Sequence, residues 1–317
     1  MSKLENLFIC VTPLQIVIAK RIIEEKQLQH VGFIILFYNE NTKYRFYIDS
    51  LKTENYLTIE YLVSSQKKFD RLIEVFKLKL FLNQTKFSTQ NIYLASIDNS
   101  LVHTILSKIR FQGLFTFDDG LANLNYQGQY YINQENNLQK LLKFIIHINW
   151  SMKKIKQVSQ CHYTLYFNQK NIISKTKFIL LSSKHQHDPS LPKLRIYIGQ
   201  PLETIDTYFS KDFIKKTLET ISADTYFPHP RETIKFENIN YIESDKILEE
   251  YYTEEIVKYN ITLYTFFSTS ILNLKQIDVT CDVVVLYDSY LMKKYSHIFN
   301  IFKQQNIKLL DIGINNE

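Results

Sequence analysis

Short apolar runs alternate along the chain with longer stretches in which apolar residues recur at helical spacing. The first run, Leu7–Val11, has the length of a buried strand, and Thr12-Pro13 follows it directly. Threonine is a favoured N-cap and proline suits the first helical position, so we expect a helix from Leu14 to about Lys26. Further strands and helices are predicted in turn at 32–38, 44–52, 57–63, 69–82, 91–95, 100–109 and 111–117. This alternation predicts an α/β domain with a parallel sheet covered by helices on both faces.

The same alternation restarts in the second half of the chain. Leu194–Ile198 is the next clear strand, and it follows a polar segment at 185–192 that contains two prolines and that we interpret as a linker. Further strands and helices are predicted at 211–222, 225–227, 241–243, 247–258, 261–266, 271–274, 283–287, 290–304 and 308–310. Two such halves predict two α/β domains, residues 1–184 and 193–317, with parallel sheets that face a central cleft.

Between these halves, Leu138–Ser159 has the apolar spacing of one long helix. It carries five lysines beside its apolar positions: Lys140, Lys143, Lys153, Lys154 and Lys156. A basic amphipathic helix of this kind can lie in a membrane interface. A helix between domains with a solvated lysine face has the same pattern, and we favour that interpretation. Strands are expected after it, at 163–167 and 177–181.

Charge and cysteine content narrow the classes of function. The net charge of +6 and the pI near 8.9 favour an anionic partner or membrane surface. The basic residues do not form the long runs of a nucleic-acid-binding arm, so we expect no nucleic-acid partner. Cys10, Cys161 and Cys281 are far apart and odd in number, which favours a reducing compartment. The apolar run near the N-terminus is too short for a signal sequence, and no window has the length of a membrane span. These features predict a cytoplasmic protein.

The segment Phe227-Pro228-His229-Pro230-Arg231-Glu232 holds one histidine between two prolines. Each proline fixes its own φ angle and biases the preceding residue toward extended conformations, so the His229 imidazole has little local freedom. An imidazole beside the Arg231 cation suits a leaving phosphate, because one group can give a proton while the other offsets charge. An ordinary surface turn has the same appearance, and the hexapeptide alone favours that interpretation.

Two acidic residues and a glycine, Asp118-Asp119-Gly120, follow the predicted strand at 111–117. Open α/β sheets place their sites at the carboxyl ends of their strands. Neighbouring residues on an extended segment point in opposite directions, so at most one of the two acids should face the site. The other can orient the turn. A solvated Asx turn is the alternative, and these three residues alone favour it.

Two turns in the second half have the character of anion-binding segments. Gly199-Gln200-Pro201 exposes backbone after a strand, and Ser268-Thr269-Ser270 places three hydroxyls where a strand meets a helix. Helix N-terminal amides and hydroxyl donors together bind anions. By contrast, His185, His187 and Asp188 in the linker resemble metal ligands, but no further ligand cluster accompanies them, and we interpret them as a loop.

Five of these motifs occur in the order seen in glycosyltransferase family 52, which includes bacterial lipooligosaccharide sialyltransferases. They are Thr12-Pro13-Leu14-Gln15, Asp118-Asp119-Gly120, Gly199-Gln200-Pro201, His229-Pro230-Arg231 and Phe267-Ser268-Thr269-Ser270. The resemblance covers essentially the whole chain. It implies a GT-B-like arrangement of two Rossmann-type domains, a metal-free reaction without a cofactor, and CMP-N-acetylneuraminic acid as the donor, held mainly by the C-terminal domain.

The resemblance also implies roles for particular residues. His229 matches a histidine that acts as general acid on the CMP phosphate or binds that phosphate. Asp118 or Asp119 matches an acidic motif that can supply the general base, and Asp206 lies where an acid of the family can serve instead. We favour the Asp118–Asp119 pair, because a base must reach the acceptor and the N-terminal domain is the expected acceptor side. The donor side is then expected to comprise Gly199, Gln200, Pro201, Pro230, Arg231, Ser268, Thr269 and Ser270, and the acceptor side Thr12, Pro13, Gln15 and Gly120.

The function predicted from these features is inverting transfer of N-acetylneuraminic acid to a terminal galactose of a surface glycan such as lipooligosaccharide. Such transfer passes through an oxocarbenium-like centre and needs a carboxylate at the acceptor hydroxyl. A hexosyltransferase of the same fold with another nucleotide sugar is one alternative, and a non-catalytic carbohydrate-binding protein is another. We also expect peripheral contact with the inner face of the cytoplasmic membrane, and assembly as a homodimer.

Overall fold

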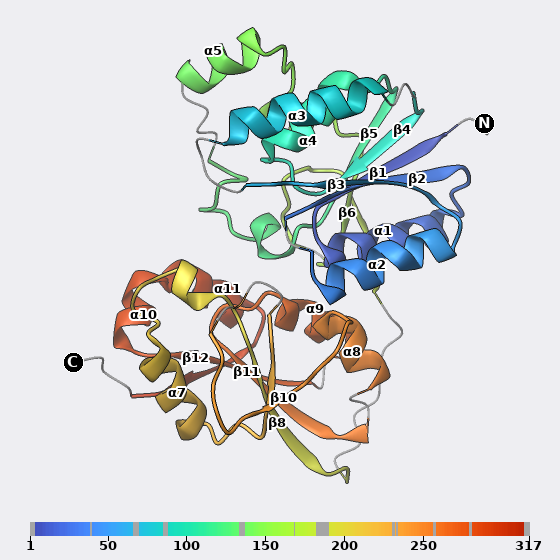
Figure 1. Ribbon diagram of the computed structural model, residues 1–317. Coiled ribbons are helices and arrows are strands. Elements are labelled where there is room, and N and C mark those ends of the chain that lie inside the picture. The colour runs from blue at the N-terminus through green and yellow to red at the C-terminus, as the bar shows by residue number, and fades with distance from the viewer. Residues whose placement is uncertain are drawn as a thin grey trace. The chain divides into compact units, whose positions relative to one another are not determined.

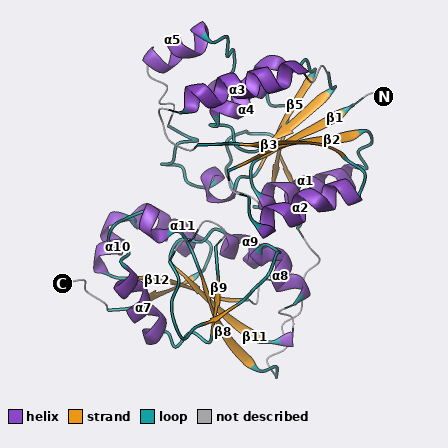
Figure 2. Cartoon of the chain, viewed as in Figure 1, coloured by secondary structure: helices purple, strands orange, loops and turns teal. Residues whose placement is uncertain are grey.

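The computed structural model divides the chain into two compact units, Met1–Leu181 and Ser182–Glu317, and each is an α/β domain (Figures 1 and 2). It describes residues 4–38, 40–65, 70–84, 88–132, 137–167, 169–181, 190–229, 232, 234–255, 258–278 and 281–313. The proposed linker residues His185, His187 and Asp188 lie outside these ranges, as do Pro230 and Arg231 of the histidine segment.

The first domain contains a seven-stranded sheet in which all neighbouring strands are parallel. Its order is β3-β2-β1-β4-β5-β6-β7, the doubly wound order of a Rossmann fold. The strands are β1 (Asn6–Cys10), β2 (Val31–Phe37), β3 (Leu57–Leu62), β4 (Asn91–Leu94), β5 (Gly113–Phe117), β6 (His162–Thr164) and β7 (Thr176–Phe178). Every residue of β1 and β2 is buried, as expected for parallel strands covered on both faces.

Helices cover both faces of this sheet, α1 and α2 on one side and α3 and α4 on the other (Figure 1). Their bounds are α1 (Pro13–Lys26), α2 (Thr42–Thr53), α3 (Arg71–Gln84) and α4 (Ser100–Lys108). The predicted start of α1 is confirmed, because Thr12 is its N-cap, with its hydroxyl accepting from the Gln15 amide at 3.4 Å, and Pro13 is its first residue.

The second domain repeats the design with a six-stranded parallel sheet of order β10-β9-β8-β11-β12-β13. Its strands are β8 (Lys193–Ile198), β9 (Thr225–Phe227), β10 (Asn240–Tyr241), β11 (Asn260–Thr265), β12 (Asp282–Tyr287) and β13 (Lys308–Asp311). Its helices are α7 (Lys211–Thr220), α8 (Leu248–Glu254), α9 (Ser270–Ile277), α10 (Ser289–Lys294) and α11 (Ser296–Gln304). Two parallel-sheet Rossmann-type domains were predicted, and both are present.

Two predictions of single long helices were wrong. The stretch 138–159 forms α5 (Asn137–Ile145) and α6 (Met152–Val158). A left-handed residue, His147 with φ 50°, follows the end of α5, and α6 has its own N-cap, Ser151, whose hydroxyl accepts from the Lys154 amide at 3.2 Å. The stretch 290–304 is likewise divided, into α10 and α11, at Tyr295. Apolar spacing continued across both breaks, so the sequence pattern did not reveal them.

Candidate functional sites at the carboxyl edges of the two sheets

Each sheet has a topological switch point, the place where the strand order reverses direction. In the first domain it lies between β1 and β4, and in the second between β8 and β11. Open α/β sheets bind ligands outside the carboxyl ends of the strands at such a point. The described site residues lie in or next to the loops that leave these strands or the adjacent strands β5 and β9.

Gln15 joins three of those loops in the first domain. Its side chain is fully buried, and its carbonyl oxygen accepts from the Val11 amide at 2.7 Å. Its amide nitrogen donates to Ser96 Oγ at 2.9 Å and to Asp119 Oδ1 at 2.7 Å. Gln15 follows β1, Ser96 follows β4 and Asp119 follows β5, so one glutamine ties the ends of three adjacent strands together. The structure thus brings two predicted residues, Gln15 and Asp119, into direct contact.

The Asp119 carboxylate is held by hydrogen-bond donors and remains partly exposed. Besides Gln15, it accepts from Ser96 Oγ at 3.1 Å and from the Tyr130 hydroxyl at 2.7 Å, both through Oδ2. These donors carry no positive charge, so they orient the carboxylate without the neutralisation that a lysine or arginine would bring. An oriented, partly exposed carboxylate at a switch point is suited to general-base chemistry.

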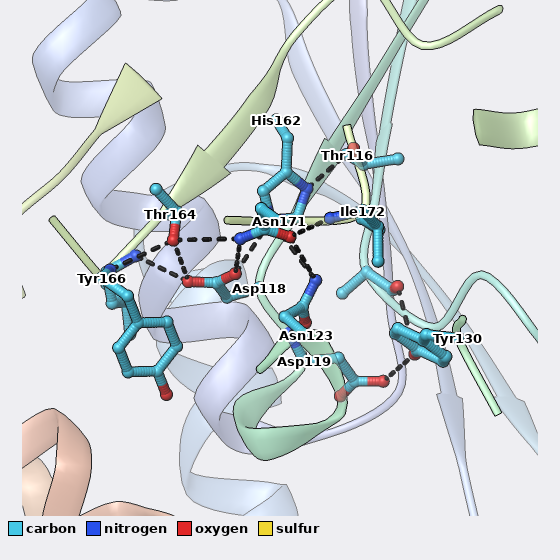
Figure 3. Close-up of polar contacts among 12 residues, drawn as sticks. Thr116, Asp118, Asp119, Asn123, Tyr130, His162, Thr164, Tyr166, Asn171 and Ile172 are labelled. Atoms are coloured by element: carbon cyan, nitrogen blue, oxygen red, sulfur yellow. Dashed lines mark hydrogen bonds and ion pairs between the residues drawn. The ribbon is translucent and has the colours of Figure 1, made fainter. Parts of the chain in front are cut away.

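Asp118 is turned the opposite way and is completely buried (Figure 3). Oδ1 accepts from His162 Nε2 at 2.8 Å and from Asn171 Nδ2 at 3.3 Å, while Oδ2 accepts from Thr164 Oγ1 at 2.9 Å and from the Leu165 amide at 2.6 Å. Four donors occupy the acceptor positions of a carboxylate, so no oxygen is left for an acceptor hydroxyl. Asp118 is therefore placed as a structural residue that links β5 to β6. Of the two acids in this motif, Asp119 is the remaining candidate for the general base.

The remaining predicted residues of this edge shape its backbone. Thr12 and Pro13 begin α1, and Gly120 has a left-handed backbone with φ 60°, which glycine adopts without strain. Sequence reasoning did not identify Ser96, Tyr130 or His162. For Ser96 and His162, position along the chain is the only sequence signal. Ser96 lies just beyond the end of β4, as Asp119 lies just beyond the end of β5, and His162 is the first residue of β6.

In the second domain, Gln200 plays the role that Gln15 plays in the first. It follows β8 and is buried, and its Oε1 accepts from Thr265 Oγ1 at 3.1 Å and from the Phe267 amide at 2.8 Å. It therefore fixes the turn that leads from β11 into α9, which contains Ser268. Pro201 caps the short 3₁₀ helix Leu202–Thr204 that follows. Gln200 of the first predicted anion-binding turn thus contacts Thr265 and Phe267, which lie just before the second turn at 268–270.

Helix α9 begins at this turn, with Ser270 as its first residue and Thr269 as its N-cap. Thr269 makes no side-chain capping hydrogen bond, so its hydroxyl does not occupy the helix amides. Glu249 of α8 accepts from Asn273 Nδ2 at 2.7 Å, and burial raises the pKa of its carboxyl group. This arrangement of hydroxyls and helix amides suits an anion such as phosphate.

His229 follows β9, which is the neighbour of β8 in the sheet. Its backbone amide donates to Glu232 Oε2 at 3.3 Å, and its carbonyl accepts from the Glu232 amide at 3.0 Å. The Gly199 amide donates to Phe227 O at 2.8 Å, so the Gly199 turn and the His229 segment run side by side. The structure thus places Gly199, Gln200, Ser268 and His229 at one sheet edge. Glu232 was not predicted to be a site residue from the sequence, yet it contacts His229, the predicted general acid, directly.

Asp206 lies beyond the short 3₁₀ helix and contacts α10. Its Oδ2 accepts from Lys294 Nζ at 2.7 Å and from the Tyr295 hydroxyl at 2.8 Å, and its side chain is only 7% exposed. The hydrogen bond from Lys294 lowers the pKa of Asp206 to about 2. A carboxylate with so low a pKa is a weak proton acceptor, although among the described residues Oδ1 accepts only from the Tyr208 amide at 3.1 Å.

Among the described residues, no three histidine, cysteine or acidic side chains gather closely enough to hold a metal ion.

The carboxyl edges of the two sheets differ in chemistry. The first presents an oriented carboxylate, and the second presents an imidazole, hydroxyls and helix amides. A carboxylate can accept a proton, and the donors of the second edge can hold a phosphate group.

The chain is similar in sequence to known proteins over most of its length. The chain is 27% identical over 97% of its length to the CMP-N-acetylneuraminate:beta-galactoside alpha-2,3-sialyltransferase of Pasteurella multocida, and covers 99% of that protein. It is 32% identical over 85% of its length to the N-acetyllactosaminide alpha-2,3-sialyltransferase of Haemophilus influenzae, and covers 88% of it.

The fold has a counterpart among solved structures. S. aureus MnaA in complex with UDP superposes with a TM-score of 0.50 at 10% identity, over 95% of this chain and 88% of that one. The chain has the two-domain, parallel-sheet architecture of the GT-B class. The family model for glycosyltransferase family 52 matches residues 30–289, a span that contains both sheet edges except the Gln15 turn. The chain belongs to glycosyltransferase family 52.

Proposed function

We propose that this protein is an inverting sialyltransferase that moves N-acetylneuraminic acid from CMP-N-acetylneuraminic acid to a terminal galactoside, forming an α-2,3 linkage. The observation that carries this proposal is similarity along nearly the whole chain to two enzymes named alpha-2,3-sialyltransferases. The chemistry of the second sheet edge supports it, because His229 and the Ser268–Ser270 turn offer donors to a nucleotide phosphate.

In the proposed reaction, the acceptor hydroxyl oxygen attacks the anomeric carbon of the sialyl group from the face opposite the leaving phosphate. The bond from that carbon to the phosphate oxygen breaks, and its electron pair stays on CMP. A carboxylate takes the hydroxyl proton, and the His229 imidazole gives a proton to the leaving phosphate or binds it. Serine hydroxyls and the N-terminal amides of α9 offset the remaining phosphate charge.

Two carboxylates are candidates for the base, one in each domain. Asp119 is held by uncharged donors, whereas the pKa of Asp206 is lowered to about 2 by Lys294. A lowered pKa makes a carboxylate a weaker proton acceptor, which counts against Asp206, so we propose Asp119. Asp206 stays the rival, because its Oδ1 accepts from the Tyr208 backbone amide rather than from a side chain, and because the reaction could draw Lys294 away.

We further propose that the acceptor is a surface glycan such as lipooligosaccharide and that the protein works in the cytoplasm against the inner face of the membrane. In the part of the chain that the structure describes, no helix is long and apolar enough to cross a bilayer. Helices α3 and α5 instead present large side chains to solvent while carrying Lys77, Lys79, Lys140 and Lys143. The exposed fractions are 55% for Ile73, 53% for Phe76, 67% for Leu80, 76% for Phe144 and 60% for Ile145.

Exposed apolar side chains among lysines favour an anionic bilayer surface. Sedimentation with anionic and with neutral vesicles tests this, and we expect binding to the anionic vesicles alone. A homodimer that covers α3 and α5 is the alternative. It would give a dimer by analytical ultracentrifugation that Phe144→Ser disrupts, without vesicle binding.

A CMP-release assay tests the proposed activity. With CMP-N-acetylneuraminic acid and a panel of galactosides, we expect release of CMP that depends on the acceptor and persists after exhaustive treatment with EDTA. Loss of the rate with EDTA and its recovery with Mg²⁺ or Mn²⁺ would contradict a metal-free reaction. Thermal stabilisation by UDP but not CMP would favour a hexosyltransferase instead. Absence of turnover with every CMP-sugar and acceptor would favour a carbohydrate-binding protein.

A further inference from the structure

Glu232 lies against the backbone of the His229 segment and reaches into the second sheet. One carboxyl oxygen accepts from the His229 amide at 3.3 Å, and the other is hydrogen-bonded to the Tyr226 hydroxyl of β9. The Glu232 amide donates in turn to the His229 carbonyl at 3.0 Å. The two residues are therefore held to each other by backbone and side chain, and both are held to the sheet through Tyr226.

Gly199 makes room for this contact. A Cβ atom at position 199 would overlap the Glu232 carboxyl group and would lie 2.6 Å from a carbon of the Tyr226 ring. Because real Cβ contacts are never so short, any larger residue at this position would displace Glu232. The close approach of Glu232 therefore explains why the predicted donor-binding turn has a glycine at position 199.

Among the described residues, the titratable groups that face Glu232 are three phenols and one further acid. They come from four elements: Tyr226 of β9, Tyr197 of β8, Tyr241 of β10 and Glu203 of the 3₁₀ helix. Burial raises the pKa of Glu232 to about 7, although the hydrogen bonds from Tyr226 and the His229 amide oppose the rise. The carboxyl group therefore takes up a proton near neutral pH, whereas Asp206 in the same domain stays ionised beside Lys294.

We propose that Glu232 is the positioning residue of His229, and that in its protonated form it braces the His229 backbone without placing a negative charge beside the donor phosphate. This proposal rests on the proposed role of His229 in donor binding. A protonated carboxyl keeps the geometry, because its carbonyl oxygen still accepts from the His229 amide. An ionised one keeps the same hydrogen bonds but repels the anionic donor.

The consequence is a pH dependence in donor binding. As the pH rises through about 7, Glu232 loses its proton, and the KM for CMP-N-acetylneuraminic acid should rise several-fold with a smaller change in kcat. Glu232→Gln keeps an acceptor for the His229 amide and cannot ionise. Its KM should lose this dependence while its kcat stays within a few-fold of the wild-type value at pH 6. Glu232→Ala removes the brace, and its kcat should fall about tenfold to a hundredfold.

The matched control is Asp278→Asn. Asp278 is also a buried acid that accepts from a tyrosine, Tyr252, at 2.7 Å, but it lies at the opposite end of α9 from Ser270. This variant should keep the wild-type pH profile of KM. If Glu232→Gln shows the wild-type profile as well, or if Glu232→Ala turns over normally, the positioning role is contradicted.

A failure of the proposed function can be told apart from a failure of this inference. If the wild-type protein turns over no CMP-sugar, the proposed activity fails, and the inference is then tested by folding. Because the pKa of Glu232 is raised in the folded state, its stabilisation is complete below its ordinary pKa and is lost as the pH rises through about 7. The melting temperature of Glu232→Gln, relative to that of the wild type, should therefore increase from pH 5 to pH 8. A constant difference would overturn the inference.

Discussion

The carboxyl edges of the two sheets are built alike and present opposite chemistry. In each, a buried glutamine braces the switch point: Gln15 joins Asp119 and Ser96, and Gln200 joins Thr265 and the amide of Phe267. At the first edge the braced group is a carboxylate, and at the second it is a turn of hydroxyls and amides. The fold therefore provides the place, and residue type decides whether a proton acceptor or an anion-binding turn occupies it.

The charges of three acids near the second edge, Asp206, Glu232 and Glu249, are limited by a lysine or by burial. Lys294 offsets the charge of Asp206, and burial raises the pKa of both Glu232 and Glu249. A site for a phosphate has to limit negative charge nearby, because like charges disfavour anion binding. The first edge needs no such restraint, and its Asp119 is held by uncharged donors.

The largest effect on turnover is expected at His229. His229→Ala should lower kcat by about 10²–10⁴, the usual contribution of one acid–base group, because the sequence 228–239 that follows β9 contains no second histidine to replace it. Initial rates of CMP release, with circular dichroism to confirm folding, measure this. Wild-type turnover in a folded variant would show that His229 lies in an ordinary surface turn without a catalytic role.

The two base candidates should separate next. Asp119→Asn should reduce kcat by about 10²–10³ and leave CMP affinity nearly unchanged, because the amide keeps the shape of the carboxylate but accepts no proton. Asp206→Asn should reduce it less. If Asp206→Asn is inactive while Asp119→Asn turns over normally, the base belongs to the second domain.

Asp118 should affect folding rather than chemistry. Asp118→Ala removes the acceptor of four donors in a fully buried place and should lower the free energy of unfolding by about 3–5 kcal/mol. Urea denaturation measures this, with Asp119→Ala as the neighbouring control. A folded Asp118→Asn variant of normal stability but without turnover would make Asp118 the base after all.

The smallest expected effect is the pH dependence of the Asp206–Lys294 pair. The lowered pKa of Asp206 means that the pair stabilises the folded protein above the ordinary aspartate pKa and that this contribution is lost as the pH falls through about 2. Asp206→Asn should thus be slightly less stable than the wild type at pH 6, and the difference should narrow by pH 3. A difference that widens toward low pH would contradict the pairing.

The periodic parts of the fold were predictable from the sequence, and the reasons are local. Strands such as β1 and β2 are unbroken apolar runs, and the start of α1 is marked by Thr12 and Pro13. The breaks at His147 and Tyr295 were missed because apolar spacing continues through them and neither residue is a strong breaker.

The motifs located the candidate sites, but contacts across the sheet decided their details. Nothing in Asp118-Asp119 tells which acid is buried, since this depends on His162 and Asn171, residues 44 and 53 positions away along the chain. Glu232 was passed over for a related reason. Its burial depends on Gly199 and Tyr226, which only the pairing of β8 with β9 brings beside it.

The most direct test of this account is calorimetric titration of CMP into four proteins: the wild type, Asp119→Asn, His229→Ala, and the double variant Ser268→Ala, Ser270→Ala. The account assigns the nucleotide phosphate to the second sheet edge. It predicts that Asp119→Asn binds CMP as the wild type does, and that the two second-domain variants bind at least tenfold more weakly. Weakened binding in Asp119→Asn together with wild-type binding in both second-domain variants would contradict it.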